Sequence, residues 1–600
     1  MNVEQSKLAE PKCSDYICEG KVKIYALNDE VFYNSAQIFN RDLSLIVIKA
    51  FSIKRNQDRI KQLSEKKTDT SGNLNKSLRI ESHTIKDEDL TKKVESQEKL
   101  TIIEPLGASG LRSLRYIIEL ADEVDFVVCG DHDPIAIKQM EKNARLNGID
   151  TNKLVCICAD ATRLLSLGNP KFIREFTSMT NKSIILGNSS WHSNLLNNIL
   201  KPNLTLKYSV VDIDPYGTCS PFIESAISAC ENGGMVCFTS TDMPILCGNM
   251  PEVTFYRYGG NALKSSYMHE MSLRLLLNAI MSCAAKCQKG VIPLISCSVD
   301  FYVRIFVQIV HSPIICKQLA QKTSIVLQCT NCPSFHVIPF GKSQPKKKRR
   351  HNISIDGGNN EEPKDEISIS PNVSNQLKYK PNNLKVPASS TINSTPILEE
   401  NLLCCECGSG YYVIGGPFYS GPLFDPDFLN KLLIICSDIE EKKVSSLQNI
   451  TMLKKIKGLL LSMKDELSDN PLHYHIPSMC TFLNLEMMKP SLFHSALRHL
   501  GYRSSHFHRD PLSLKTNAPN QVVMDILRTW ALEHPPKNSQ HHKFLQKPIS
   551  TLNIKFEIHP CILLASKVGP RWLPNPEDNW GPKSRPGNNS KKKKVKHNIL

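Results

Sequence analysis

The residues best suited to chemistry are Asp214, Pro215 and Tyr216, which directly follow the apolar run YSVVDI. An amino group on an aromatic base is a poor nucleophile because its lone pair is delocalised into the ring. Two acceptors aimed at its hydrogens would localise that lone pair. The Asp214 carboxylate and the Pro215 carbonyl can supply them, and Asp214 can also take up the proton. Tyr216 offers a face on which the base can stack. The tetrapeptide DPYG alone would equally fit an ordinary turn that closes a strand.

A glycine-rich loop precedes these residues in the chain. Gly107 and Gly110, in EPLGASGLRSLR, follow an apolar strand and open a helix, so the backbone there can approach a ligand closely. Nicotinamide and S-adenosylmethionine sites share this layout. The full G-x-G-x-x-G fingerprint is absent, which weakens the dehydrogenase interpretation.

Acidic residues end the next two apolar runs. DFVVCGD ends at Asp131, and LVCICAD ends at Asp160, which is followed by Ala161. Acids at the carboxyl ends of successive strands line the crevice where such sheets bind nucleotides, and Asp131 could accept both hydroxyls of a ribose. Asp133 is a rival for the ribose role. Any one of these acids could instead cap a helix, but that explanation is less attractive for all of them together.

Four cysteines form two C-x-x-C knuckles, a spacing that suits a tetrahedral zinc site: Cys329, Cys332, Cys404 and Cys407. The stretch between the knuckles is long, but removing its polar insert leaves a span of ordinary size. Cys405 is a spare thiol. The N-terminus lacks the apolar segment of a secretory signal, so we expect reduced thiols and zinc rather than disulfides. Four thiolates leave no ligand position for water, which indicates a structural metal.

These residues need a folded sheet to position them. Between Leu100 and about Val310, short apolar runs alternate with helical patterns that end at glycines. Six runs have the composition of buried strands: TIIEPL, DFVVCGD, LVCICAD, YSVVDID, GMVCFTS and FYVRIFVQIV. The alternation predicts a doubly wound α/β domain with a parallel or mixed sheet.

The chain is too long for one core, and changes in composition along it indicate where folded parts and polar inserts alternate. Two polar stretches, 54–98 and 341–395, hold too few large apolar residues to offset chain entropy and are predicted to be disordered inserts. The other parts that we expect are a flexible tail over 1–20, the sheet domain over 21–320, a four-cysteine zinc region over 321–425, a second folded domain over 426–582 and a basic tail over 583–600.

The net charge of +16 favours a polyanionic partner such as a nucleic acid, because basic faces neutralise phosphates. No apolar run reaches the length of about 18 residues that a membrane span needs. The basic run PKKKRR, residues 345–350, fits a nuclear localisation signal, with a solvated or RNA-touching loop as the alternative. We therefore expect a nuclear protein. A mitochondrial pool is an alternative that the N-terminus does not support.

Several long blocks, in order, carry a resemblance to a known family. VFYNSAQIFNRDLS, EPLGASGLRSLR, DIDPYGTCSPFIESAI, STDMPILCG, YMHEMSLRLLL and PLISCSVDFYVRIFV are similar to successive blocks of the tRNA (guanine-26-N2)-dimethyltransferase family. The resemblance implies a Rossmann-like class I methyltransferase domain that uses S-adenosylmethionine, and a zinc-bearing α+β C-terminal domain that binds tRNA. It also implies transfer of methyl groups to the exocyclic N2 of guanine 26. No obligate protein partner is inferred.

The resemblance further implies residue roles. The cofactor contacts would be Arg41, Arg112, Asp131, Asp160 and Ala161, the last beside the adenine, with Gly107 and Gly110 in the loop. The catalytic segment would be Asp214, Pro215 and Tyr216. Phe32 would form the other side of a sandwich around the base, with the adjacent Tyr33 as the alternative.

The chain departs from the family mildly, with Ser35 where proline is usual and Tyr216 where phenylalanine is commoner. His269 and Glu270 could pass for an acid/base pair, but their place on an amphipathic helix favours a structural or substrate-positioning role. Two rival functions stay open. One is a catalytically inactive, zinc-dependent tRNA-binding or folding factor, and the other is an amino-methyltransferase that acts on another nucleic acid.

Overall fold

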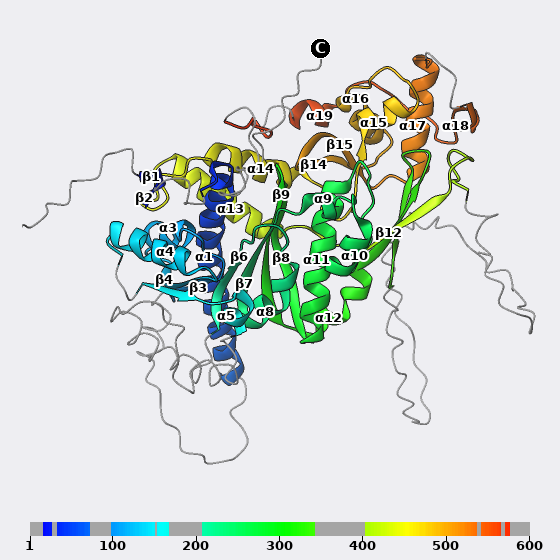
Figure 1. The fold of residues 1–600 in the computed structure, drawn as a ribbon. Coiled ribbons are helices and arrows are strands. Elements are labelled where there is room, and N and C mark those ends of the chain that lie inside the picture. Colours follow the sequence, from blue (N-terminus) through cyan, green and yellow to red (C-terminus); the bar gives the residue numbers. More distant parts are fainter. Residues whose placement is uncertain are drawn as a thin grey trace, which may run out of the picture.

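The computed structural model is centred on a seven-stranded sheet in the order β5-β4-β3-β6-β7-β9-β8 (Figure 1). The structure describes residues 16–26, 33–71, 98–149, 153–166, 207–341, 403–536, 542–565 and 570–576. The strands from β5 to β7 run parallel, whereas β9 pairs antiparallel with both β7 and β8. The strands are β3 (Leu100–Glu104), β4 (Val124–Asp131), β5 (Leu154–Cys158), β6 (Tyr208–Ile213), β7 (Cys230–Ser240), β8 (Lys289–Val299) and β9 (Tyr302–His311). The predicted doubly wound α/β domain is confirmed.

Helices cover this sheet. All six residues of β6 are buried, as expected for a central parallel strand with helices on both sides. Helix α1 (Ile38–Ser71) packs against α3 (Leu111–Glu119), and α11 (Met268–Lys286) packs on β8. The remaining helices of this part are η2 (Ser35–Gln37), α4 (Pro134–Leu146), α5 (Ala161–Ser166), η3 (Ser220–Phe222), α8 (Ile223–Ala229), α9 (Met243–Leu246), α10 (Pro251–Tyr258) and α12 (Pro313–Lys317).

Two small sheets follow the large one along the chain. The first has the order β11-β10-β12 and carries the cysteine knuckles, and the second has the order β13-β15-β14. Their strands are β10 (Thr323–Cys329), β11 (Phe335–Pro339), β12 (Tyr412–Tyr419), β13 (Tyr474–His475), β14 (Ser504–Phe507) and β15 (Asp510–Thr516). The accompanying helices are η4 (Leu319–Lys322), α13 (Pro426–Glu440), α14 (Leu453–Asp465), α15 (Ile476–Phe482), α16 (Pro490–His499), α17 (Asn520–Glu533), α18 (His542–Gln546) and α19 (Pro560–Ala565).

The expected domain boundary at residue 426 is wrong. Leu432 of α13 and Leu460 of α14 belong to the same core as the large sheet. Both helices pack on α1, and α13 also packs on β8. A separate core consists of the four knuckle cysteines together with apolar residues from Tyr474 onward. The first two helices after the zinc region therefore complete the sheet domain because their apolar faces cover it.

Two segments expected to be disordered contain regular structure. The end of the predicted 1–20 tail forms β1 (Tyr16–Glu19), which pairs with β2 (Val22–Tyr25). Helix α1 continues through Ser71, so the predicted insert over 54–98 begins too early. The polar composition of its second half is compatible with a helix because the first half is buried. Lys54 also pairs with Asp58 one turn away, and Arg55 pairs with Glu231 of β7.

Some sequence predictions lie outside the described residues. These are the basic run at 345–350, the tail over 583–600 and all but residue 341 of the polar insert 341–395. Within the described ranges, no helix has both the length and the apolar character needed to cross a membrane.

Candidate active site and metal centre

A cavity of about 400 Å³ lies at the carboxyl ends of β3, β4 and β6. Its wall contains residues 106–109, 111 and 112 of the glycine loop, but not Gly110, together with Arg41, Asp131, Asp214 and Tyr216. Ligands of doubly wound sheets bind at this edge because loops and helix N-termini converge there. The glycine loop, Asp131 and the segment with Asp214 and Tyr216, which the sequence predicted separately, therefore lie at the same cavity.

The glycine loop is shaped by its lack of side chains. The backbone N–H of Gly107 donates to the Gly130 carbonyl at 2.7 Å, and a Cβ at Gly107 would overlap the Cys129 sulfur. Gly110 has a φ of 74°, a conformation that favours glycine, and immediately precedes α3. The loop can therefore pass close to β4 and leave the cavity open above it.

Asp131 and Asp133 are distinguished by what they bind. Asp131 lines the cavity and accepts hydrogen bonds from the backbone N–H groups of Ala108 and Asp133, both at 3.0 Å. The Asp133 carboxylate accepts from Ile135 N at 2.8 Å and caps α4. Helix capping explains Asp133. Of these two aspartates, Asp131 is therefore the one that lines the cavity.

Asp160 also caps a helix. Its carboxylate accepts from the backbone N–H groups of Thr162 and Arg163, at 3.0 and 3.2 Å, at the start of α5. The hydrogen bond from the Thr162 side chain is the main cause that lowers the pKa of Asp160. Asp160 is exposed and Ala161 is buried, and neither forms part of the cavity wall. The structure thus brings together Asp131 and the glycine loop, but not these two residues.

Arg112 lies at the centre of the ion network in the crevice. Its guanidinium pairs with the Asp214 carboxylate and lies 3.4 Å from Glu104 Oε1 and 3.7 Å from Asp212 Oδ2. Burial opposes the charge, but the carboxylates of Asp214 and Asp212 raise the pKa of Arg112. Burial raises the pKa of Glu104 to about 7, against the opposing effect of Arg112. Asp214 is therefore held beside a fixed positive charge.

A deeper layer holds Arg112 in place. Arg304 of β9 forms an ion pair with Asp212 at 2.8 Å, and the Tyr116 hydroxyl donates to Asp212 at 2.5 Å. Burial would raise the pKa of Asp212, but Arg304 and Arg112 outweigh it and lower that pKa. The Ser44 hydroxyl accepts from both arginines, at 2.8 Å from Arg304 and 3.1 Å from Arg112. Arg304, Asp212 and Ser44 thereby hold the Arg112 side chain in position.

Arg41 is held by a residue of the N-terminal hairpin. Its guanidinium makes a two-pronged ion pair with Glu19, at 2.6 and 2.5 Å, and lies over the ring of Tyr33. Both Arg41 and Tyr33 line the cavity. Phe32, the predicted stacking residue, lies outside the described residues, whereas its alternative Tyr33 is placed at the site.

The predicted catalytic segment follows β6 in a tightly held turn. Pro215 is buried, whereas Tyr216 is 56% exposed. Gly217, with a φ of 106°, donates its N–H to the Thr241 hydroxyl at 3.0 Å and accepts from Thr241 N at 2.9 Å. The loop after β6 is therefore fastened to the loop after β7, while the Tyr216 ring stays accessible.

Four residues of the site were not predicted from the sequence: Glu19, Glu104, Asp212 and Arg304. Glu104 and Asp212 stand at the ends of predicted strands, next to residues that the sequence predicted for the site. Their position in the sequence could therefore have indicated them. Glu19 and Arg304 offered none, because their partners lie far away in the chain. Arg304 and Ser44, for example, are 260 residues apart.

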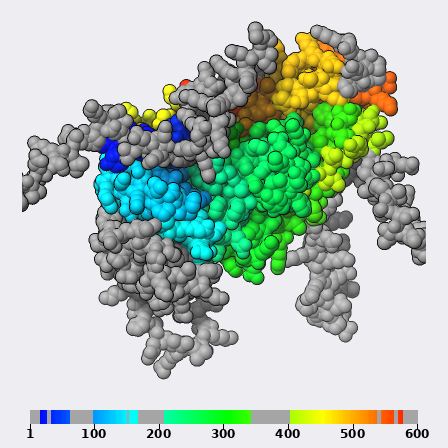
Figure 2. Space-filling model, in the orientation of Figure 1, coloured from blue at the N-terminus to red at the C-terminus, as the bar shows by residue number. Residues whose placement is uncertain are grey.

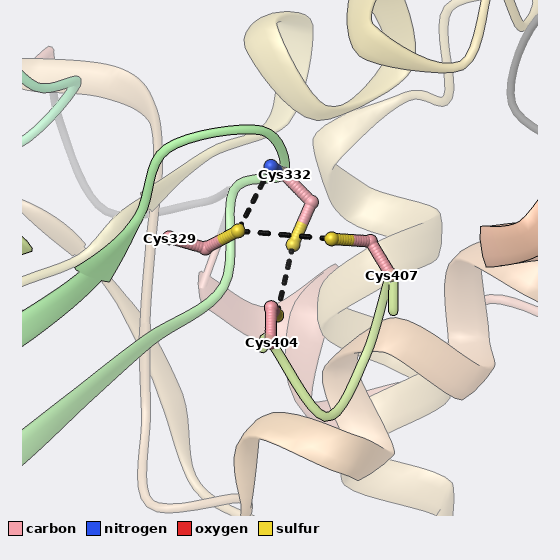
Figure 3. Close-up of side chains that lie close together, drawn as sticks. All are labelled: Cys329, Cys332, Cys404 and Cys407. Atoms are coloured by element: carbon pink, nitrogen blue, oxygen red, sulfur yellow. Dashed lines mark hydrogen bonds between the residues drawn. The ribbon is translucent and has the colours of Figure 1, made fainter. Parts of the chain in front are cut away.

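The four knuckle cysteines come together as predicted (Figure 3). Their sulfurs all lie within 4.8 Å of one another, with 3.7 Å between Cys329 and Cys407 and 3.6 Å between Cys332 and Cys404. Tetrahedral zinc with Zn–S bonds of about 2.3 Å requires sulfurs roughly 3.8 Å apart, so the cluster fits the ion. Cys405 is exposed and lies outside the cluster, as expected of a spare thiol.

The knuckles are also tied to the C-terminal core. Glu406, between the two ligands of the second knuckle, pairs with Arg528 of α17 at 2.7 Å. Arg528 pairs in turn with Asp525 at 2.8 Å. All four cysteines are buried. Their closed arrangement indicates a structural metal site that joins the β10–β12 sheet to the helices beyond it.

His269 and Glu270 have no access to the cavity. Glu270 is fully buried and pairs with Arg274 and Lys515, both at 2.8 Å. Burial is the main cause that lowers the pKa of His269 to about 4. The structural role that we expected for Glu270 accounts for these contacts.

A doubly wound sheet with a glycine loop, a ribose-type acid and an Asp-Pro-Tyr segment at one cavity defines a class I S-adenosylmethionine-dependent methyltransferase. The model of the N2,N2-dimethylguanosine tRNA methyltransferase family matches residues 14–179 and 186–528. The chain therefore belongs to that family.

Individual relatives agree with this assignment. The chain is 31% identical to a tRNA (guanine(26)-N(2))-dimethyltransferase of Drosophila melanogaster, over 98% of this chain and 89% of the relative. It is 30% identical to the enzyme of the same name from Schizosaccharomyces pombe, over 93% and 90% of the two chains. A solved structure of Trm1 from Pyrococcus horikoshii with S-adenosyl-L-methionine has a similar fold, with a TM-score of 0.53, 19% identity and coverage of 85% and 98%.

Proposed function

We propose that this chain transfers methyl groups from S-adenosylmethionine to the exocyclic N2 of guanine 26 in tRNA. The observation that carries the proposal is the position of Asp214. It ends a fully buried strand, pairs with Arg112 and opens on the cavity beside the accessible ring of Tyr216. Family membership indicates which nucleobase and which RNA are the substrate. The residues of the site are suited to chemistry on an amino group.

The cavity residues fit the cofactor. Gly107 and Gly110 let the backbone approach it, Asp131 offers a carboxylate to a pair of hydroxyls, and Arg41 and Arg112 are cations suited to a carboxylate group. Bound S-adenosylmethionine supplies an electrophilic methyl group. We keep Asp160 and Ala161 as proposed neighbours of the adenine on the strength of the resemblance.

Asp214 and Pro215 prepare the amino group. The Asp214 carboxylate and the Pro215 carbonyl accept its two hydrogens, which localises the nitrogen lone pair, and Asp214 then takes up the released proton. Arg112 supports this role because its guanidinium pairs with the Asp214 carboxylate and fixes its position at the cavity. Tyr216 stacks on the base from one side. Phe32, or Tyr33 in its place, is proposed for the other side.

The zinc site has a supporting role in this proposal. Its four buried thiolates hold the knuckles against α17, in the part of the chain that we propose binds the body of the tRNA. The excess of positive charge over the whole chain supports an RNA partner. We also propose a nuclear location from the basic run 345–350, and no obligate protein partner.

The test is methyl transfer by the purified chain to two tRNA transcripts that differ only at position 26. With labelled S-adenosylmethionine, the guanine-26 transcript should acquire N2-methylated guanosine, identified by nucleoside analysis, and the adenine-26 transcript should not. Equal labelling of both transcripts would overturn the assigned position. Tight tRNA binding without any transfer would instead favour an inactive binding factor.

A further inference from the structure

Helix α10 and the turn before it present an unusual amount of apolar surface. Met250, Phe255 and Tyr256 are 51, 60 and 71% exposed, and together they form what we name the α10 ledge. Single exposed apolar side chains are ordinary on any protein surface. Three large, exposed apolar side chains within seven residues of one short segment are more than such isolated cases. Helix α10 lies on the face that Figure 2 displays.

The ledge is rigidly fastened to the catalytic segment. Tyr258, at the end of α10, has its hydroxyl 2.6 Å from the Thr218 hydroxyl, two residues after Tyr216. The same hydroxyl bonds to Asp242 at 2.8 Å, and Arg257 pairs with Asp242 at 3.1 Å. Thr254 and Tyr258 are buried one turn apart and hold α10 by one face, whereas the exposed side chains of Phe255 and Tyr256 leave the helix about 100° from each other, away from that face.

The chemistry of the ledge suits RNA. Bases stack on exposed aromatic rings, and such contacts tolerate any base because each has a π-face. The Arg257 guanidinium lies 5.8 Å from the centre of the Tyr256 ring and places a cation beside the stacking surface. Glu252, an exposed acid of the same helix, lies one turn before the two rings, so Arg257 is the cation that offsets its charge beside the ledge.

We propose that the α10 ledge is a second stacking platform, which takes a nucleotide of the tRNA next to the target guanine while that guanine occupies the cavity. This proposal rests on the proposed function, since it needs an RNA at the site. A base drawn out of a helix leaves its neighbours without a stacking partner, and the ledge would replace that partner. The fixed link through Tyr258 and Thr218 would set the distance between the two nucleotides.

The test compares ring-deleting with ring-preserving variants of the full chain. Phe255→Ala with Tyr256→Ala should raise the Kd for guanine-26 tRNA about tenfold or more, since each stacked base contributes on that scale. Phe255→Tyr and Tyr256→Phe should keep the wild-type Kd because both rings remain. Affinity for S-adenosylmethionine and the melting temperature should be unchanged in every variant. The slope of log Kd against log salt should also be unchanged, because no charge is lost.

Ile314→Ala provides the matched control, since Ile314 on α12 is 70% exposed and lies outside both the cavity wall and the part of the chain proposed to bind the body of the tRNA. It should leave the Kd for tRNA as in the wild type. The proposal is overturned if the double alanine variant binds and methylates tRNA like the wild type, or if the Ile314 variant loses as much affinity. It is also overturned if the double variant keeps its affinity for tRNA but no longer co-purifies with a protein that binds the wild-type chain. That result would assign the ledge to a protein partner. Failure of the wild-type chain to methylate tRNA would overturn the proposed function instead.

Discussion

Two buried ion networks of similar composition lie in different parts of the molecule. The crevice network consists of Glu104, Arg112, Asp212, Asp214 and Arg304. The seam network consists of Glu270, Arg274, Glu466, His508 and Lys515, where α11 meets β15 and the end of α14. Both place carboxylates against cations with little water, yet only one is a candidate for chemistry.

The seam network is closed. Lys515 Nζ lies 2.8 Å from both Glu270 Oε1 and Glu466 Oε1, and all three side chains are at most 1% exposed. Burial would raise the pKa of Glu466, but Lys515 and His508 outweigh it and lower that pKa to about 2. His508 Nδ1 lies 2.8 Å from Glu466, and its Nε2 accepts the Ser298 N–H at 3.1 Å. Both ring nitrogens of His508 therefore have a partner within the protein.

The crevice network differs in its exposure. Glu104, Arg112 and Asp214 all line the cavity, but the side chains of Glu104, Arg112 and Asp212 are at most 5% exposed, whereas that of Asp214 is 20% exposed. A closed set of charges can only specify how parts of the protein fit together. A set with one open carboxylate can exchange a proton or a hydrogen bond with a ligand. Access, rather than composition, therefore separates the network that is a candidate for chemistry from the closed one.

Removing the open carboxylate should have the largest effect. Asp214→Ala deletes an acceptor and the proposed proton acceptor, so we expect methyl transfer to fall by roughly 10⁴-fold. Arg112 keeps Glu104 and Asp212 as partners, so the fold should survive. The measurements are single-turnover transfer to tRNA, with the melting temperature and calorimetric binding of S-adenosylmethionine as controls. A variant that retains a tenth of the wild-type rate would remove Asp214 from the proposed mechanism.

Breaking the seam network should destabilise the protein without a direct effect on methyl transfer. Lys515→Met leaves Glu270 and Glu466 buried with less positive charge, which should cost about 4 kcal/mol of stability. Lys457→Met is the matched control because Lys457 pairs with Glu440 nearer the surface, where such pairs contribute about 0–1 kcal/mol. Thermal unfolding of the three proteins measures the difference. Equal melting temperatures for both variants would show that the seam network does not stabilise the fold.

The sequence was most informative where function is local. The buried run YSVVDI and the tetrapeptide after it could be recognised together because a strand and its following turn are adjacent in the chain. The zinc ligands were also predictable, since each knuckle has its own fixed spacing. Gly107 and Asp131 followed from strand ends, which a parallel sheet brings to one edge.

The sequence was least informative where a contact joins distant segments. Glu19 holds Arg115, 96 residues away, yet the composition around it predicts only a tail. Lys515 reaches Glu270 across 245 residues, and nothing in GYRSSHFHRDPLSLKT distinguishes this lysine from a surface one. The polar half of α1 was predicted to be disordered because composition does not reveal that a buried first half anchors it.

The smallest effect is expected from Glu104, the closed end of the crevice network. Burial raises its pKa from 4.5 to about 7 in the folded protein. Between these values the unfolded chain releases the proton and the folded chain keeps it, so this group makes stability fall as pH rises from about 4.5 to 7. The loss should be on the order of 3 kcal/mol, with little further change above pH 7.

Glu104→Gln removes that titration while it keeps the shape of the side chain. The melting temperature of the variant, relative to that of the wild type, should therefore rise from pH 5 to pH 7.5, measured without S-adenosylmethionine. Asp122→Asn serves as the control, since Asp122 is an exposed acid in the turn before β4. A difference between Glu104→Gln and wild type that does not change with pH would mean that Glu104 stays ionised. Arg112 would then balance three buried or half-buried carboxylates at once, and the crevice would resemble the seam more closely than its burial indicates.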